Sequence, residues 1–331
     1  MYVIETRKLV KKYGDLIAVK GIDIKVSEGE IFGLIGPNGA GKTTTLSILS
    51  CMLLPTSGEA YVNGYNVVTQ SERVRRSIGI VFQDPAVDEN LTGRENLEIH
   101  AMLYNVPGKV AKQRIGEALK LVELTDRSKS LVKTYSGGMR RRLEIARGLV
   151  HRPKVLFLDE PTIGLDPQTR SKIWDYIDNL AKNEKMTIII TTHYMDEADR
   201  LCNRIAIMDM GEIKAEGTPE ELKKRLGGDI ITVRTKSINK MVDMASKLDF
   251  VKNVNKTSDE VKLNVENGET HLTDVACAAS DQGIDIKSVT IHEPTLEDVF
   301  LFYTGTEIRE EAAGSQMSFT RATFGYGRPG R

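Results

Sequence analysis

The stretch GPNGAGKT, from Gly36 to Thr43, restricts the fold of this chain more than any other feature. The apolar run Ile31–Ile35 precedes it with the pattern of a short strand, and Thr43–Met52 follows it with helical spacing. Glycines let successive backbone N–H groups turn inward, where a Cβ atom would collide, and the N-terminus of a helix adds a partial positive charge. The stretch therefore predicts a phosphate-binding strand–loop–helix unit.

Two polar residues at the end of this loop define its expected chemistry. Lys42 is expected to lie on the β and γ phosphates of a bound ATP, and Thr43 to ligate Mg²⁺. The alternative is a glycine-rich turn that only caps a helix, and the flanking strand and helix argue against it. The loop residues expected to contact the nucleotide are Gly36, Pro37, Asn38, Gly39, Ala40, Gly41, Lys42 and Thr43.

A pair of adjacent acids ends a second apolar run. Val155–Leu158 has the composition of a buried strand, and Asp159 and Glu160 follow it directly. Consecutive strand residues point to opposite faces, so the two carboxylates can have different functions. Asp159 is predicted to reach the Mg²⁺ ion, and Glu160 to orient or deprotonate the attacking water. Either acid alone could be an ordinary helix cap.

The SGG triplet Ser136–Gly138 opens a predicted helix, Met139–Val150. Two interpretations remain open from the residues alone. In one, Ser136 simply caps the helix, because serine is a favoured N-cap residue. In the other, Ser136 and the helix N-terminus bind a second phosphate group.

Three further residues give weaker signals. Gln83 and His193 each follow a predicted strand of one parallel sheet, and ligands bind at the carboxyl ends of such strands. A single glutamine is nonetheless usually solvated, and a single histidine at a strand end is more often structural. Tyr13 could stack on adenine or be an ordinary packing contact, with nothing in the sequence to decide between them.

The pattern along the chain predicts an α/β architecture with a smaller second unit. Strand-like alternation covers Tyr2–Val10, Ile17–Val26 and Gly58–Val62, and a helical insert is predicted at about residues 84–150. Residues 1–217 are predicted to form the nucleotide-binding domain. Residues 218–305 are predicted to form an α+β domain of ferredoxin-like order, and residues 306–331 a disordered tail.

Charge and hydropathy limit the function classes. Lys+Arg and Asp+Glu both number 46, so the chain lacks the basic field on which sequence-independent nucleic-acid binding depends, and no nucleic-acid partner is expected. The N-terminal residues have no signal-peptide core, and the apolar runs are shorter than the roughly 20 residues of a membrane span. We therefore expect a cytoplasmic protein, whose association with a membrane would require a partner that spans it.

Together these motifs resemble the ATP-binding subunits of ATP-binding cassette (ABC) transporters over about residues 2–217. The resemblance implies the ABC-cassette form of the phosphate-loop NTPase fold, with a mixed sheet core, an antiparallel β part and a helical part. It also implies a homodimer with ATP and Mg²⁺ at the interface, where Ser136–Gly138 of one protomer meets the phosphate loop of the other. The matching elements are Tyr13 (adenine stacking), Gly36–Thr44 with Thr44 as a further nucleotide contact (Walker A), Gln83 (Q-loop, at the metal and the reaction), Ser136–Gly138 (signature), Asp159 and Glu160 (Walker B), Asp166 (D-loop, crossing the interface) and His193 (switch histidine, at the γ-phosphate).

The signature departs from the family's common form, with Tyr135 and Met139 where the family more often has Leu and Gln. This variant, and the ending Glu293–Gly305, resemble the drug- and antibiotic-export branch typified by the daunorubicin-resistance ATPases. The resemblance implies an ATPase that powers export through a separate membrane permease, bound at the inner face of the cell membrane. The alternatives are an ABC ATPase that acts on nucleic acid or ribosomes, and a ligand-regulated ATPase switch.

Overall fold

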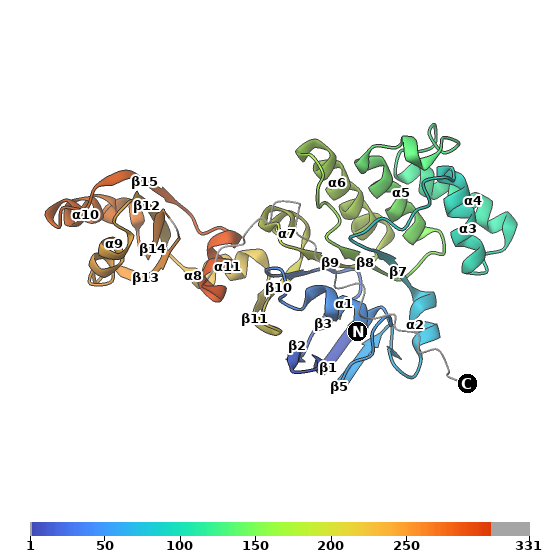
Figure 1. Cartoon of the computed structure of the whole chain (residues 1–331), viewed down its shortest axis with the longest axis horizontal. Helices are drawn as coiled ribbons and strands as arrows, with labels where there is room; N and C mark the ends of the chain where they lie inside the picture. The colour runs from blue at the N-terminus through green and yellow to red at the C-terminus, as the bar shows by residue number, and fades with distance from the viewer. Residues whose placement is uncertain (1, 258, 306–331) are drawn as a thin grey trace, which may run out of the picture.

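The computed structural model describes residues 2–257 and 259–305, and within these ranges the strands form three sheets (Figure 1). The central sheet has the order β11-β10-β4-β9-β8-β7. Its strands run parallel except for β11, which pairs antiparallel with β10 at the edge. The bounds are β4 Ile31–Ile35, β7 Ile78–Val81, β8 Val155–Asp159, β9 Thr187–Thr192, β10 Arg204–Asp209 and β11 Glu212–Gly217.

The inner strands of this sheet are buried on both faces, which explains their continuous apolar sequences. Every residue of β4, β8 and β9 is buried. Alternate residues of β8 divide between two cores: Leu156 and Leu158 pack with Ile173 of a covering helix, whereas Phe157 packs with Ile4 of the antiparallel sheet. The sheet is thus held between a helical layer and a second sheet.

That second sheet is antiparallel, as predicted, but one predicted strand is divided. The stretch Ile17–Val26 forms two strands, both paired with β1. Gly21 adopts a positive φ of 78°, and the Asp23 carboxylate accepts a hydrogen bond from the Lys8 amide at 2.7 Å, which interrupts the strand ladder. The strands are β1 Tyr2–Tyr13, β2 Leu16–Ile22, β3 Lys25–Ser27, β5 Ser57–Val62 and β6 Tyr65–Asn66.

The predicted helical insert is present, and it explains Tyr135. The Tyr135 ring is 4% exposed, and its hydroxyl donates to the Arg127 carbonyl oxygen at 2.7 Å. The residue therefore packs inside the helical part. The helices of the nucleotide-binding part are α1 Lys42–Leu49, α2 Ser71–Ser77, α3 Gly93–Leu103, α4 Gly108–Leu121, the 3₁₀ turn Val132–Thr134, α5 Gly137–Leu149, α6 Pro167–Glu184 and α7 Met195–Leu201.

The third sheet belongs to the smaller unit, which projects from one end of the molecule (Figure 1). Its strand order β13-β14-β12-β15 is antiparallel throughout. With two helices packed on one face, this is the ferredoxin-like order that the sequence predicts. The elements are β12 Asp229–Thr235, α9 Ile238–Ala245, β13 Val251–Lys256, β14 Glu260–Val265, α10 Gly268–Asp281 and β15 Ile286–His292.

The chain returns from this unit to the part that holds the central sheet. Helix α11, Leu296–Thr304, packs against α7 and against α8, Pro219–Leu226. Its Leu296, Val299 and Phe300 are buried in the same apolar core as the central sheet, although the sequence assigns them to residues 218–305. The domain boundaries remain a prediction, and the predicted tail, residues 306–331, lies outside the described residues.

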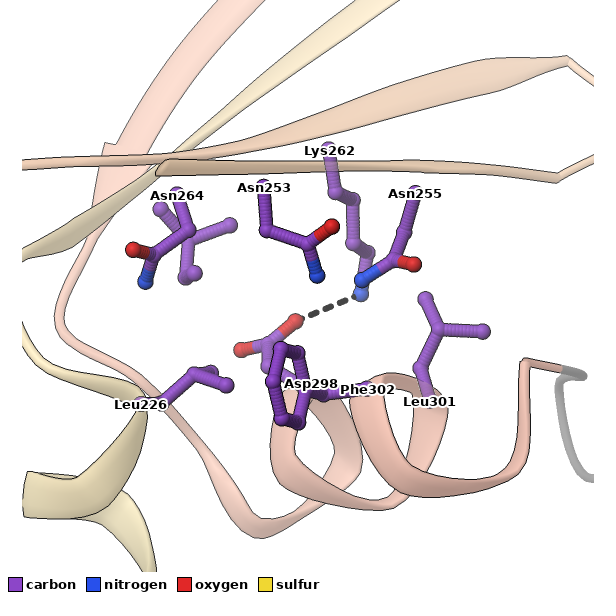
Figure 2. Close-up of a pocket in the computed structure, with 9 residues that line it drawn as sticks. Leu226, Asn253, Asn255, Lys262, Asn264, Asp298, Leu301 and Phe302 are labelled. Carbon is purple, nitrogen blue, oxygen red and sulfur yellow. Dashed lines mark hydrogen bonds and ion pairs between the residues drawn. The ribbon is translucent and has the colours of Figure 1, made fainter. Parts of the chain in front are cut away.

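A buried charge joins the first turn of α11 to the small sheet. Asp298 is 3% exposed and accepts a hydrogen bond from the Lys262 ammonium at 2.8 Å, as Figure 2 shows. The same carboxylate lies 3.0 Å from His292 Nε2 and caps the helix through Thr295. This cluster fixes the small sheet relative to α11.

Candidate active site at the carboxyl ends of the parallel strands

The phosphate loop lies between the end of β4 and the start of α1, as predicted. Gly41 has a φ of 105°, and a Cβ atom there would overlap the Ala18 carbonyl oxygen. A Cβ atom on Gly36 would overlap the Met208 carbonyl oxygen. Among the described residues no side chain caps the N-terminus of α1, so the amides of its first turn remain available to an anionic ligand.

Lys42 is a buried cation that folds back on this loop. Its side chain is 5% exposed, and its ammonium donates hydrogen bonds to the carbonyl oxygens of Gly36 at 2.7 Å and Pro37 at 3.1 Å. Burial lowers the pKa of this ammonium, and the nearby Glu160 and Asp159 oppose that shift. A phosphate group in the loop would give the buried charge a stronger acceptor than these neutral carbonyls.

Asp159 faces the start of α1 from the end of β8. Its Oδ1 accepts hydrogen bonds from the hydroxyls of Thr43, at 3.3 Å, and of Thr191. Burial raises the pKa of this carboxyl, against the effect of the Thr191 hydrogen bond. A hydroxyl and a carboxylate at this separation are the hard oxygen ligands that Mg²⁺ prefers, and a cation would compensate the buried carboxylate. The donor set fits the predicted Mg²⁺ site.

Glu160 lies in a different electrostatic environment from its neighbour. Its Oε1 is 3.3 Å from Nδ1 of His193 and 4.0 Å from the ammonium of Lys42. Burial acts to raise the pKa of this carboxyl, but His193, Lys42 and Arg141 outweigh it, so the pKa lies below its ordinary value. Glu160 is therefore ionised at neutral pH, as a proton acceptor must be.

The structure brings some of the predicted residues together and leaves others apart. Lys42, Thr43, Asp159, Glu160 and His193 form one cluster at the carboxyl ends of β8 and β9. Gln83 follows β7, next to β8 in the sheet, and within the described chain no hydrogen bond joins it to the cluster. Tyr13 is 45% exposed at the end of β1, where its ring lies 5.2 Å from the ammonium of Lys11.

The signature residues lie beside the D-loop of their own chain. Ser136 caps α5 by accepting a hydrogen bond from the Met139 amide at 3.2 Å, so the capping interpretation holds. Asp166 caps α6 in the same way. The two helix starts are in contact, because a Cβ atom on Gly138 would overlap the Thr169 side chain. Whether Ser136–Gly138 also contact a phosphate group stays a prediction.

Sequence reasoning missed two residues that organise the cluster, Thr191 and Arg141. Thr191 donates to Asp159 and accepts from the Glu160 amide. The signal for it is the pair of hydroxyl residues that follows the apolar run Ile188–Ile190. Arg141 donates to main-chain carbonyl oxygens around the cluster. It was hidden in the run Arg140–Arg142, since no pattern distinguishes a buried arginine from its solvated neighbours.

Comparison with known families gives two matches along the chain. The family described as ABC transporter matches residues 19–163, and the ATP-binding protein DrrA1-3-like, C-terminal domain matches residues 217–304. Among curated proteins, the daunorubicin resistance ATP-binding protein DrrA2 of Streptomyces coeruleorubidus is 40% identical over 94% of this chain and 99% of its own. The linearmycin resistance ATP-binding protein LnrL of Bacillus subtilis (strain 168) is 39% identical over 93% of this chain and 100% of its own.

Solved structures of ATP-binding cassettes resemble about two thirds to three quarters of the chain. A dimeric ATP-binding cassette in a post-hydrolysis state, bound to ADP and Pi, is 30% identical with a TM-score of 0.59, covering 65% of this chain and 98% of its own. The cbiO1 subunit from Clostridium perfringens, part of an ABC transporter complex, is 29% identical with a TM-score of 0.63, covering 75% and 96%.

Proposed function

This chain belongs to the ATP-binding subunits of ABC transporters, and on that premise we propose that its ATP hydrolysis powers export of a drug, antibiotic, lipid or other hydrophobic compound through a separate membrane subunit. Relatives named for daunorubicin and linearmycin resistance support this class of cargo. The observation that carries the proposal is the placement of Glu160 and Asp159 against the phosphate loop, at Lys42 and Thr43 respectively.

The proposed chemistry assigns one function to each group of the cluster. Lys42 and the first-turn amides of α1 bind the phosphates, and Glu160 accepts a proton from the attacking water or orients it. Thr43 and Asp159, with Gln83, hold Mg²⁺, which would neutralise developing charge on the phosphate oxygens. The contact of His193 with Glu160 supports a position beside the γ-phosphate.

A second copy of the chain completes the proposed site. Ser136 and Asp166 are exposed at two helix starts that touch through Gly138 and Thr169, and within the described residues they form no hydrogen bond with Lys42. We therefore place the partner subunit's Ser136 over the ATP of this protomer. The dimeric cassettes among the solved relatives support the arrangement. Tyr13, partly exposed, is proposed to stack on the adenine.

Transport requires a membrane partner in this proposal. None of the helices in the described ranges combines the length and apolarity that crossing a bilayer takes. Large apolar side chains are exposed on one face of α3, at the outer edge of the molecule in Figure 1: Ile99 is 44% exposed, Met102 67% and Leu103 73%. Exposed apolar patches mark interaction sites. We assign this face to the membrane subunit, which would hold the ATPase at the inner surface of the membrane.

Replacing Met102 and Leu103 together with Ser should reduce co-purification of the membrane subunit by about tenfold or more, since each buried apolar side chain contributes about 1.5–3 kcal/mol. ATP hydrolysis by the isolated subunit should not change. Met52→Ser with Leu54→Ser, exposed to 60% and 64% on another surface, is the matched control. Equal co-purification of both double variants would show that the α3 face is not the contact.

We infer that the small domain has a supporting function. The cavity between its sheet and α11, drawn in Figure 2, measures about 10 Å³. That volume is about one water molecule, so this cavity is too small for an organic ligand. The Lys262–Asp298 pair crosses this space, which favours a mechanical link to α11.

Export itself is tested in cells that carry this chain and the membrane protein that co-purifies with it. They should accumulate less daunorubicin than cells that carry the membrane protein with the Glu160→Gln variant. Daunorubicin also serves as the first compound of a substrate-stimulated ATPase screen of the purified complex. Unchanged accumulation and no stimulation by any hydrophobic compound in the screen would reject the export function while leaving the ATPase assignment intact.

A further inference from the structure

Arg141 is a charged side chain buried beside the proposed catalytic cluster. It is 8% exposed, and within the described part of the chain no carboxylate lies within ion-pair distance of its guanidinium. All its hydrogen bonds go to main-chain carbonyl oxygens. The acceptors are Pro161 at 2.7 Å, Asp159 at 2.9 Å, Glu160 at 2.9 Å and Phe82.

Burying a guanidinium without a carboxylate partner lowers the stability of the folded protein. A guanidinium taken out of water loses its hydration, and neutral carbonyls compensate it less well than a carboxylate would. In keeping with this, burial lowers the pKa of Arg141. The planar fork of an arginine can, however, hold several acceptors in fixed directions at once, which a lysine cannot.

The acceptors include a residue with a strained backbone. Glu160 has a φ of 45°, in the left-handed region that residues with long side chains rarely adopt. Residues held in such a conformation persist where their surroundings over-determine them. Here the Glu160 amide donates to the Thr191 carbonyl oxygen at 3.0 Å, and the Glu160 carbonyl accepts from Arg141. The residue is therefore held on both sides of its Cα atom.

The same face of α5 also holds the segment that carries Gln83. Arg141 binds the carbonyl of Phe82, directly before Gln83. One and two turns further along α5, Glu144 accepts from the Ala86 amide at 2.6 Å, and Arg147 donates to the Ala86 carbonyl oxygen at 2.9 Å. Both ends of the segment 82–86 are thus tied to α5, the helix that Ser136 caps.

We propose that Arg141 is a positioning residue that holds Glu160 in its left-handed conformation, and so aims the Glu160 carboxylate at the reacting water. This rests on the proposed role of Glu160. Because Arg141 lies on the signature helix α5, its bond to the Glu160 carbonyl makes the orientation of Glu160 depend on the placement of α5. Its bond to Phe82 ties the segment that carries Gln83 to the same side chain. The residue acts through main-chain atoms and does not touch ATP.

The test measures kcat and the affinity for ATP separately in the Arg141→Lys variant. Lysine keeps the charge but cannot bind acceptors in several directions, so kcat should fall about tenfold or more, since small misplacements of a catalytic group are that costly. The affinity for ATP should stay within about twofold, because the phosphate loop is untouched. Arg142→Lys is the matched control. Arg142 follows Arg141 on α5 but donates to the Val122 carbonyl oxygen at 3.0 Å, away from the cluster, so its kcat should not change.

Arg141→Gln is a second variant for the case in which the buried lysine charge prevents Arg141→Lys from folding. Glutamine carries no charge, so its burial does not have that cost. This variant should lower kcat in the same way. The single tryptophan of the chain, Trp174, reports unfolding by its fluorescence. Wild-type kcat in a folded Arg141 variant, or an equal loss of ATP affinity and kcat, would overturn the proposal.

A double-mutant cycle with Glu160→Gln shows whether Arg141 acts through Glu160. If it does, adding Arg141→Lys to Glu160→Gln should reduce the residual turnover by less than about twofold. The same tenfold loss in both backgrounds would show an independent role and reject the inference. Wild-type turnover in the single Glu160→Gln variant would instead reject the proposed function on which it rests.

Discussion

Replacing Glu160 with Gln should lower ATP turnover by about 100-fold or more, the range that a positioned general base contributes. Gln keeps the size of the side chain but cannot accept a proton. The wild-type carboxylate is ionised at neutral pH because His193 and Lys42 outweigh the effect of burial on its pKa. Binding of ATP should remain, since Lys42 keeps its hydrogen bonds to the loop carbonyls without Glu160.

The variant should also accumulate as a dimer when ATP is added, because the closed state is no longer emptied by hydrolysis. Steady-state phosphate release measures the first effect, and gel filtration with and without ATP the second. Glu220→Gln, on the exposed side of α8, is the control for loss of a surface charge. Phosphate release at the wild-type rate would remove Glu160 from its role, whatever the oligomeric state.

Lys42→Met should weaken ATP binding by roughly 100-fold, since a hydrogen bond to a charged group contributes about 1.5–3 kcal/mol and each 1.4 kcal/mol is tenfold. Met preserves the buried volume at a side chain that is only 5% exposed. What disappears is the ammonium that can exchange the Gly36 and Pro37 carbonyls for phosphate oxygens. Asp159 and Glu160 also lose a compensating charge, which increases repulsion toward the nucleotide.

Titration with a fluorescent ATP analogue measures this loss directly. The matched control is Lys172→Met on the exposed side of α6, which should bind as the wild type does. Affinity within about threefold of the wild type in Lys42→Met would contradict the placement of the phosphates at this loop.

The phosphate loop could be predicted from sequence because its constraint is local. Gly36 and Gly41 leave room for neighbouring carbonyls, and any chain with this glycine spacing between a strand and a helix meets the same steric demand. The acids Asp159 and Glu160 were identified for a similar reason: a polar pair directly after a buried strand emerges at the edge of the sheet.

The contacts made by Arg141, Thr191 and α11 could not be predicted, because they depend on segments far apart in sequence. Arg141 reaches carbonyls at the ends of two strands, and nothing in an arginine triplet shows which member is buried. The helical pattern of α11 predicts a helix but not the surface on which it packs. The predicted contacts of Tyr13, Ser136 and Asp166 with ATP involve a ligand or a second copy and remain predictions.

The return of α11 to the main core also affects how the protein is made. Synthesis runs from the N-terminus, so Leu296, Val299 and Phe300 leave the ribosome only after the whole ferredoxin-like unit has been translated. Until then, the apolar surface around α7 and α8 that these side chains cover stays open to solvent or to chaperones. The small unit can fold first, and the nucleotide-binding part is completed last, by nine residues near the end of the described chain.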